Sequence, residues 1–399
     1  MTTNQIRSSA GNSDPPRRTR NRPTILLIDD ELAEAEAQRD LLRGPFDILT
    51  RLPEDVTDDD LASASVVLVD LKLDHWTAHA GLPVSLKPDD GIALTAVLRS
   101  HLSAEGRSTS PKVFALNSGQ LDELSPDMPS GARRPAIART YNLEWAFKKT
   151  ETGPIMVRQL SSLANAVESL IKLSSTGTSA LSESQIRRLL AVPMRASWQT
   201  RASEDIFASR PPLTADPIAS AGVSFLRWLL HEVLPYPCFL LEDRYVAARL
   251  QVSVESLREV AADSKKTVYN RVLGKAEYSG ILGDFLGRRW WRSGVEASLW
   301  DLTSGKPFDS ASLRKAVKSI SGKLEPVDLV DPVVSVDPTG QPSDMLIALS
   351  EAVEVGPAGW PDHAEKAWVS LEAARQDPYL RAMVVEHERD RLSAGRHSS

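Results

Sequence analysis

The sequence feature that most constrains the fold is a set of four short apolar runs, each closed by polar residues. The runs are 24–28, 66–69, 113–116 and 143–147, and the residues that close them are Asp29 and Asp30, Asp70, Asn117 and Ser118, and Lys148. Stretches rich in helix-forming residues lie between and after these runs, at 31–43, 91–102 and about 154–173. Such alternation predicts an α/β doubly wound parallel sheet.

The polar residues that close the runs should meet at one place. Open parallel sheets bind their ligands at the carboxyl ends of the strands, where these side chains lie. Carboxylates are ligands that Mg²⁺ accepts, so Asp29, Asp30 and Asp70 form a candidate metal site. With the metal present, Asp70 could act as the nucleophile toward a phosphoryl group. Lys148 and a side chain at 117–118 would then bind the phosphoryl oxygens.

Four segments in the same order resemble the receiver domain of bacterial two-component response regulators. They read ILLIDDE, VVLVDLKLD, VFALNSG and WAFKK, and the resemblance covers about residues 24–173. It implies a flavodoxin-like fold in which Asp70 is the phosphate acceptor, Mg²⁺ is the cofactor and Lys148 is the lysine that the family requires. It also places Trp145, three residues before Lys148, at the aromatic switch position. The implied partners are a histidine kinase or a phosphotransfer protein in a phosphorelay, and a downstream protein.

The sequence departs from the family pattern at three points. The glycine expected about eight residues after the acceptor is Gly91, which follows Asp70 by 21 residues, so the intervening loop is longer. Lys149 stands where a proline normally follows the lysine. Either Asn117 or Ser118 can occupy the switch position, and one sequence leaves both open. These departures keep open a receiver that serves as a scaffold in a stress or phage-defence signalling system without being phosphorylated.

The rest of the chain divides by composition. We expect a disordered basic tail over 1–23, the receiver-like domain over 24–173, a linker over 174–180, a helical domain over 181–323, and an extended segment with C-terminal helices over 324–399. The predicted helices are 181–191, 221–234, 242–250, 254–262, 294–302, 309–321, 345–354 and 361–392, and the extended segment is 325–343. The C-terminal region is therefore expected to be mainly α-helical.

Residues 242–262 resemble a helix-turn-helix, with Ser253 as the cap of the second helix. In a DNA-binding version, the side chains facing the groove would be Val254, Glu255, Ser256 and Arg258. One arginine beside one glutamate is a poor surface for neutralising phosphates, so a DNA-binding regulator is the less favoured alternative. No hydrolase or nucleotide-loop motif is present, and an enzymatic output has no positive support.

Charge and composition indicate the compartment and the partners to expect for this protein. Residues 1–22 hold five arginines and one aspartate, whereas residues 23–150 hold 21 acidic and 13 basic residues. The single cysteine, Cys238, excludes an internal disulfide and is typical of a reducing cytoplasm. No apolar run approaches the roughly 20 residues that span a bilayer, so we expect no membrane partner. A homodimer through about 143–173 is expected from the family resemblance alone.

Overall fold

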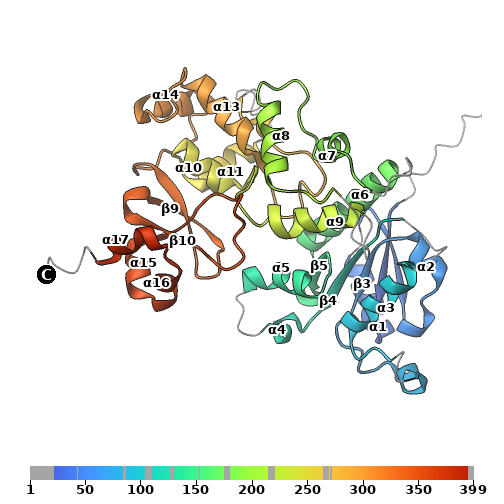
Figure 1. Cartoon of the computed structure of the whole chain (residues 1–399). Helices are drawn as coiled ribbons and strands as arrows, with labels where there is room; N and C mark the ends of the chain where they lie inside the picture. The colour runs from blue at the N-terminus through green and yellow to red at the C-terminus, as the bar shows by residue number, and fades with distance from the viewer. Residues whose placement is uncertain are drawn as a thin grey trace, which may run out of the picture.

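The two larger β-sheets of the described chain lie one in each half (Figure 1). The computed structural model describes residues 22–42, 44–83, 87–103, 110–125, 130–151, 153–174, 180–213, 221–263, 269 and 272–393. All but residues 22 and 23 of the predicted tail over 1–23, and all but residues 174 and 180 of the predicted linker over 174–180, lie outside these residues. Along the described chain, no helix combines the length and the apolar character needed to cross a membrane.

The first sheet has five parallel strands in the order β2-β1-β3-β4-β5. The strands are β1 (Thr24–Ile28), β2 (Asp47–Arg51), β3 (Ala64–Val69), β4 (Val113–Ser118) and β5 (Trp145–Lys148). The helices between and after them are α1 (Leu32–Leu41), α2 (Asp58–Ser63), α3 (Gly91–Ser103), α4 (Leu121–Leu124), α5 (Ser130–Thr140) and α6 (Pro154–Ser174). This order is that of a flavodoxin-like fold, as the sequence predicts.

The two faces of this sheet are covered by different helices. Because side chains alternate along a strand, Leu27 packs with α1 and α6, while Leu26 packs with α2, α3 and α5 on the opposite face. The central strands are apolar on both faces, which is typical of a parallel sheet covered on both sides. The carboxyl ends of β1, β3, β4 and β5 therefore share one edge of the sheet.

The second half begins with helices. They are α7 (Glu183–Leu189), α8 (Gln199–Ala208), α9 (Ala221–Trp228) followed by a π-helical turn (Leu229–Val233), α10 (Asp243–Leu250), α11 (Val254–Ala262), α13 (Arg292–Leu302) and α14 (Ser310–Ile320). The predicted helices in 181–321 all have counterparts here, within a few residues at their ends. A two-stranded sheet of β6 (Leu240–Leu241) and β7 (Trp290–Trp291) runs through this region.

In the last part of the chain, two strands begin within 325–343, the segment expected to be extended, and strands rather than a helix occupy 345–348 and 352–355. This part holds a four-stranded sheet in the order β10-β11-β8-β9. Its strands are β8 (Pro332–Val336), β9 (Pro342–Ala348), β10 (Ala352–Val355) and β11 (Ala367–Ser370), and the helices α15 (Leu371–Gln376), α16 (Pro378–Met383) and α17 (Arg389–Ser393) follow. The predicted helix over 345–354 is wrong because these residues pair as strands, β9 with β8 and β10 with β11.

One continuous apolar core joins the two halves. It contains the inner face of the first sheet, helix α6, helix α9 and the segment that carries Phe285. Trp145 on β5 meets Phe285 edge-on, with ring centroids 4.8 Å apart. On α6, the side-chain amide of Gln159 donates to the carbonyl of Phe285 at 3.2 Å. The receiver-like part therefore packs directly on the C-terminal half.

Candidate functional site

Three aspartates gather at the carboxyl edge of the first sheet. Asp29 and Asp30 follow β1, Asp70 follows β3, and one carboxylate oxygen from each lies within 4.8 Å of the other two. Asp29 and Asp70 are buried, and Asp30 is partly buried. Hard oxygen ligands in this arrangement fit Mg²⁺ or a similar divalent cation. The structure therefore brings together the three residues predicted to bind metal.

A lysine occupies the centre of this cluster. The ammonium of Lys149 lies 2.7 Å from Asp29 Oδ2, 2.9 Å from Asp70 Oδ2 and 3.2 Å from Glu34 Oε2 on α1. Backbone amides hold the remaining oxygens in place, because Glu31 N donates to Asp29 Oδ1 and Leu71 N donates to Asp70 Oδ1. The cluster thus combines three carboxylates, a fixed cation and oriented amide donors.

Burial shifts the ionisation of these groups. Removal of solvent raises the pKa of Asp70 to about 6, against the opposing pull of Lys149 and with a further rise from the Asp29 charge. Burial also raises the pKa of Asp30. For Lys149, burial acts against the charged form, but the hydrogen bonds to Asp29 and Asp70 outweigh it and raise the pKa. The site therefore holds a lysine cation close to two acids, Asp30 and Asp70, whose ionisation burial disfavours.

The structure corrects the lysine assignment. Lys148, predicted to enter the pocket, points to the opposite face of the sheet and pairs with Asp122 at 2.9 Å. The reason is the alternation of side chains along β5, since Trp145, Phe147 and Lys149 share the face of α1 and α6. The positions of Trp145 and Phe147 in the sequence therefore indicate that Lys149, and not Lys148, enters the site.

The two candidate switch residues on β4 lie on opposite faces. Asn117 is on the acceptor face, but its side-chain amide is paired with Gln38 of α1 through hydrogen bonds of 2.7 and 3.0 Å. Ser118 faces the other side, where its hydroxyl accepts from Gln120 N at 3.1 Å. In this structure neither side chain is oriented by the aspartate cluster.

Trp145 does not stand at the aromatic switch position, which corrects a second prediction. Counting three residues back from Lys149 gives Ala146, which has no aromatic ring to move. Trp145 itself is buried on the face of α6 against Phe285. Its indole N–H is buried without a hydrogen-bond partner among the described residues. The ring therefore belongs to the joint core of the two halves.

The long loop after Asp70 ends at Gly91, which lies against the backbone of Asp70. The amide of Gly91 donates to Leu71 O at 2.8 Å, and a Cβ at this position would lie 1.7 Å from the carbonyl oxygen of Asp70. Only glycine allows so close an approach. Within the intervening loop, the backbone N–H of His75 donates to Asp30 Oδ2 at 2.5 Å. The insertion thus contributes to the site, although the loop has a different length from that expected.

Sequence reasoning missed a buried ionic network beneath β5. Glu144 is fully buried and binds Arg99 of α3 at 2.7 Å and Arg227 of α9 at 2.6 Å. His231 lies 3.0 Å from the carbonyl oxygen of Glu144, so its Nε2 must carry the proton and donate. These contacts bind the C-terminal half to the strand that ends at the site. They also cover part of the surface, about 143–173, predicted to form a homodimer.

The helix-turn-helix pair exists as α10 and α11, but its predicted reading surface is covered. Val254 and Ser256 are buried, and Glu325 N donates to the hydroxyl of Ser256 at 3.1 Å. Arg258 is bound to both carboxylate oxygens of Asp344 at 2.6 and 3.0 Å. Of the four predicted residues only Glu255 is fully exposed, and a carboxylate repels phosphate. The geometry disfavours DNA binding by this helix.

The strand order and the aspartate cluster together define an α/β protein with a flavodoxin-like parallel sheet and an acidic cluster at its carboxyl edge. No protein-family model matches the chain, and a search of curated proteins found no match. A solved structure of the RcsB response regulator from Salmonella typhimurium, described in terms of conformational dynamism for DNA interaction, aligns with 15% identity over 52% of this chain and 98% of that chain, with a TM-score of 0.24.

Proposed function

We propose that the chain is a receiver-type signalling protein that accepts a phosphoryl group on Asp70 in the presence of Mg²⁺. The observation that carries this proposal is the approach of three carboxylates within 4.8 Å of one another, with Lys149 joined to two of them. Carboxylates so close repel each other unless cations neutralise them. Asp29, Asp30 and Asp70 would hold the metal, and the metal would supply the positive charge and polarise the phosphoryl group.

The residues of the chain perform the remaining steps. A carboxylate oxygen of Asp70 forms a bond to phosphorus, and the bond from phosphorus to the donor breaks. The electron pair leaves with the donor, a phosphohistidine of a kinase or phosphotransfer protein, whose imidazole then takes a proton. Lys149 neutralises charge on the transferred group, a role that preorganised cations fill in phosphoryl transfer. The product is an aspartyl phosphate.

The acceptor site connects to the C-terminal half through β5. Lys149 follows β5 directly, and Glu144, which precedes β5, binds Arg227 of α9. Phosphorylation of Asp70 removes one of the three carboxylate partners of Lys149 and adds charge nearby. We infer that this change is passed through the packing of β5 to a helical output region that binds a downstream protein.

Intact-mass measurement tests the acceptor chemistry. The full chain is incubated with acetyl phosphate and Mg²⁺, beside Asp70→Asn, Lys149→Met and Lys148→Met. We expect a single added phosphoryl group in the native protein and in Lys148→Met, and its loss in the other two variants. Absence of any adduct in the native protein, with Mg²⁺ present, would refute the proposal.

A second function is favoured by one observation. The acceptor face holds no movable switch, because Asn117 is paired with Gln38 and the aromatic position is Ala146. A receiver of this kind can serve as a scaffold whose cluster is neutralised by Lys149 alone. In that case no adduct forms, and Asp70→Ala leaves partner binding unchanged.

A further inference from the structure

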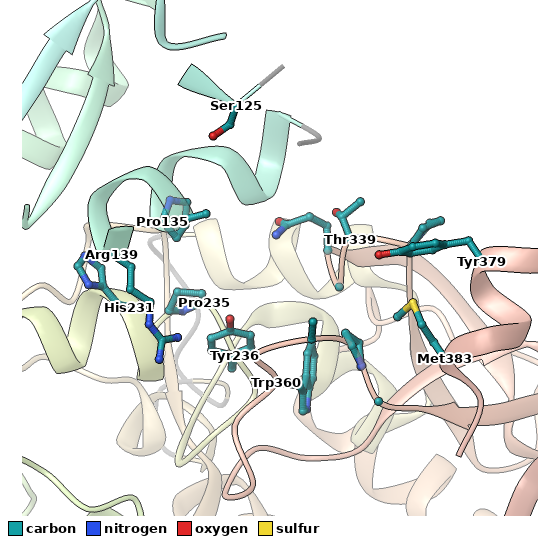
Figure 2. A pocket seen from close by; sticks show the side chains of 18 of the residues that line it. Ser125, Pro135, Arg139, His231, Pro235, Tyr236, Thr339, Trp360, Tyr379 and Met383 are labelled. Carbon is teal, nitrogen blue, oxygen red and sulfur yellow. The ribbon is translucent and has the colours of Figure 1, made fainter. Parts of the chain in front are cut away.

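A cleft of about 1090 Å³ lies between the receiver-like part and the C-terminal sheet (Figure 2). One wall is helix α5, which contributes Pro135 and Arg139. The opposite wall comes from the π-helical turn, the β8–β9 turn, the loop before β11 and helix α16. No residue of the aspartate cluster lines it, so the cleft is a separate site. Its volume is that of a site for a ligand the size of a nucleotide or larger.

Aromatic rings form much of the lining. Tyr236 and Trp360 stand nearly perpendicular, at 78°, with ring centroids 5.2 Å apart. The indole N–H of Trp360 donates to Glu365 O at 2.8 Å, which fixes the orientation of the ring. Tyr379 lies across the cleft from them, with 63% of its surface exposed. Flat, oriented rings of this kind provide stacking surfaces for a planar ligand.

The charge of the lining selects anions. Arg139 is the one side chain among the described lining residues that is charged at neutral pH, and none of them carries a carboxylate. Arg139 has Glu232 as an ionic partner at 3.6 Å, and both side chains are largely exposed. Because that contact is long and solvated, an incoming anion can compete for the guanidinium. Figure 2 places Arg139 at one end of the cleft and Tyr379 at the other.

A rigid polar turn completes the cleft. In the β8–β9 turn, Asp337 Oδ1 accepts from the backbone N–H groups of Thr339 and Gln341 at 2.8 and 3.0 Å, and from the Thr339 hydroxyl at 2.7 Å. Gly340 takes a φ of +77° in this turn and faces the ring of Trp360. The turn therefore presents Gln341 on a fixed support. Its carboxamide has the donor and acceptor pair that matches the edge of a nucleobase.

We propose that this cleft binds a nucleotide. The base stacks on the aromatic wall of Trp360 and Tyr379, its edge meets Gln341, and the phosphate meets Arg139. The proposal does not depend on phosphorylation of Asp70, since the two sites share no residue.

Calorimetric titration of the full chain with AMP, GMP, CMP and UMP tests the proposal. Adenosine, guanosine and inorganic phosphate separate the base from the phosphate, and a proline-rich peptide tests the other ligand that aromatic grooves accept. We expect saturable binding of at least one nucleotide, with its nucleoside weaker by about tenfold or more because the charged contact is lost. Binding of the peptide alone, or of phosphate alone, would overturn the assignment.

Two variants localise the binding to the cleft. Arg139→Gln should reduce the affinity for the nucleotide to that for its nucleoside, whereas Arg134→Gln, on the same helix but outside the cleft, should change nothing. Trp360→Leu should weaken nucleotide and nucleoside together, and Trp360→Phe should restore part of the loss. Circular dichroism confirms that each variant is folded. No binding up to millimolar concentration, or binding that these changes leave intact, rejects the proposal. Asp70→Asn should bind nucleotide normally, which separates this test from that of the acceptor site.

Discussion

Replacing each of the two adjacent lysines by methionine should have very different effects on stability. Lys149 is 12% exposed and binds Asp29 and Asp70, whose side chains are 0% and 11% exposed. Removing one partner of a buried ion group leaves the others uncompensated and typically costs about 3–5 kcal/mol. Asp70 can limit that cost by taking up a proton: its pKa is about 6 with Lys149 in place, and the variant lacks the lowering effect of that lysine, so protonation at pH 7 costs no more than about 1.4 kcal/mol. We therefore expect Lys149→Met to lose about 3 kcal/mol at pH 7.

Lys148→Met is the matched control. Its partner Asp122 is 53% exposed, and exposed ion pairs contribute little, so the unfolding midpoint should move only slightly. Urea unfolding is followed by tryptophan fluorescence and by far-ultraviolet circular dichroism, since coincident curves justify a two-state treatment. The decrease in the free energy of unfolding caused by Lys149→Met should become smaller toward pH 5, where Asp70 is protonated. It should also become smaller on addition of Mg²⁺. Equal losses in the two variants would refute the side-chain register of β5 described here.

Three other predictions concern the same region. In urea unfolding at pH 7 without metal, Asp70→Asn should be more stable than the native protein by as much as about 3 kcal/mol. The pKa of Asp70 is raised above its ordinary value, so its ionisation lowers the free energy of unfolding as the pH rises through about 6. The gain should therefore vanish at pH 4. Burial lowers the pKa of His231, so stability should fall as the pH drops below about 6.5, and thermal unfolding of His231→Gln should show a flatter acid dependence. Gly91→Ala should lose about 2 kcal/mol or more, and acetyl phosphate should label it poorly, because the new Cβ displaces the Asp70 backbone; normal labelling and stability would contradict the close approach.

Local pattern was enough to predict the first sheet and its acidic edge. The runs that end at Asp29 and Asp70 are short, apolar and bounded by helix-forming stretches, so strand identity and the position of the carboxylates follow directly. The lysine was misassigned because two lysines stand side by side, and a shift of one residue along a strand exchanges the faces. Trp145 and Phe147 are apolar residues at alternate positions, so they mark the face of the strand that Lys149 shares, and they would have identified Lys149 as the lysine of the site.

The interactions between the two halves could not be predicted from local pattern. Glu144 reads as a polar residue within the apolar run 143–147, yet it is buried by Arg99 and Arg227, which are 45 and 83 residues away. In the last sheet, 325–343 was expected to be extended, but the strand residues within 345–354 were mistaken for helix, because short apolar runs give only a weak local preference for strand or helix. Strand pairing between distant segments overrides such preferences.

The core shared by Trp145, helix α6 and Phe285 limits where this chain can be divided into fragments. Receiver-like folds lend themselves to exchange as cassettes when a free linker joins them to their neighbours. Here a cut near residue 174 would expose the apolar side of α6, so the excised fragment should be prone to aggregation. Fusions and chimaeras should therefore keep helix α6 and the segment that carries Phe285 in one piece, with no junction near residue 174.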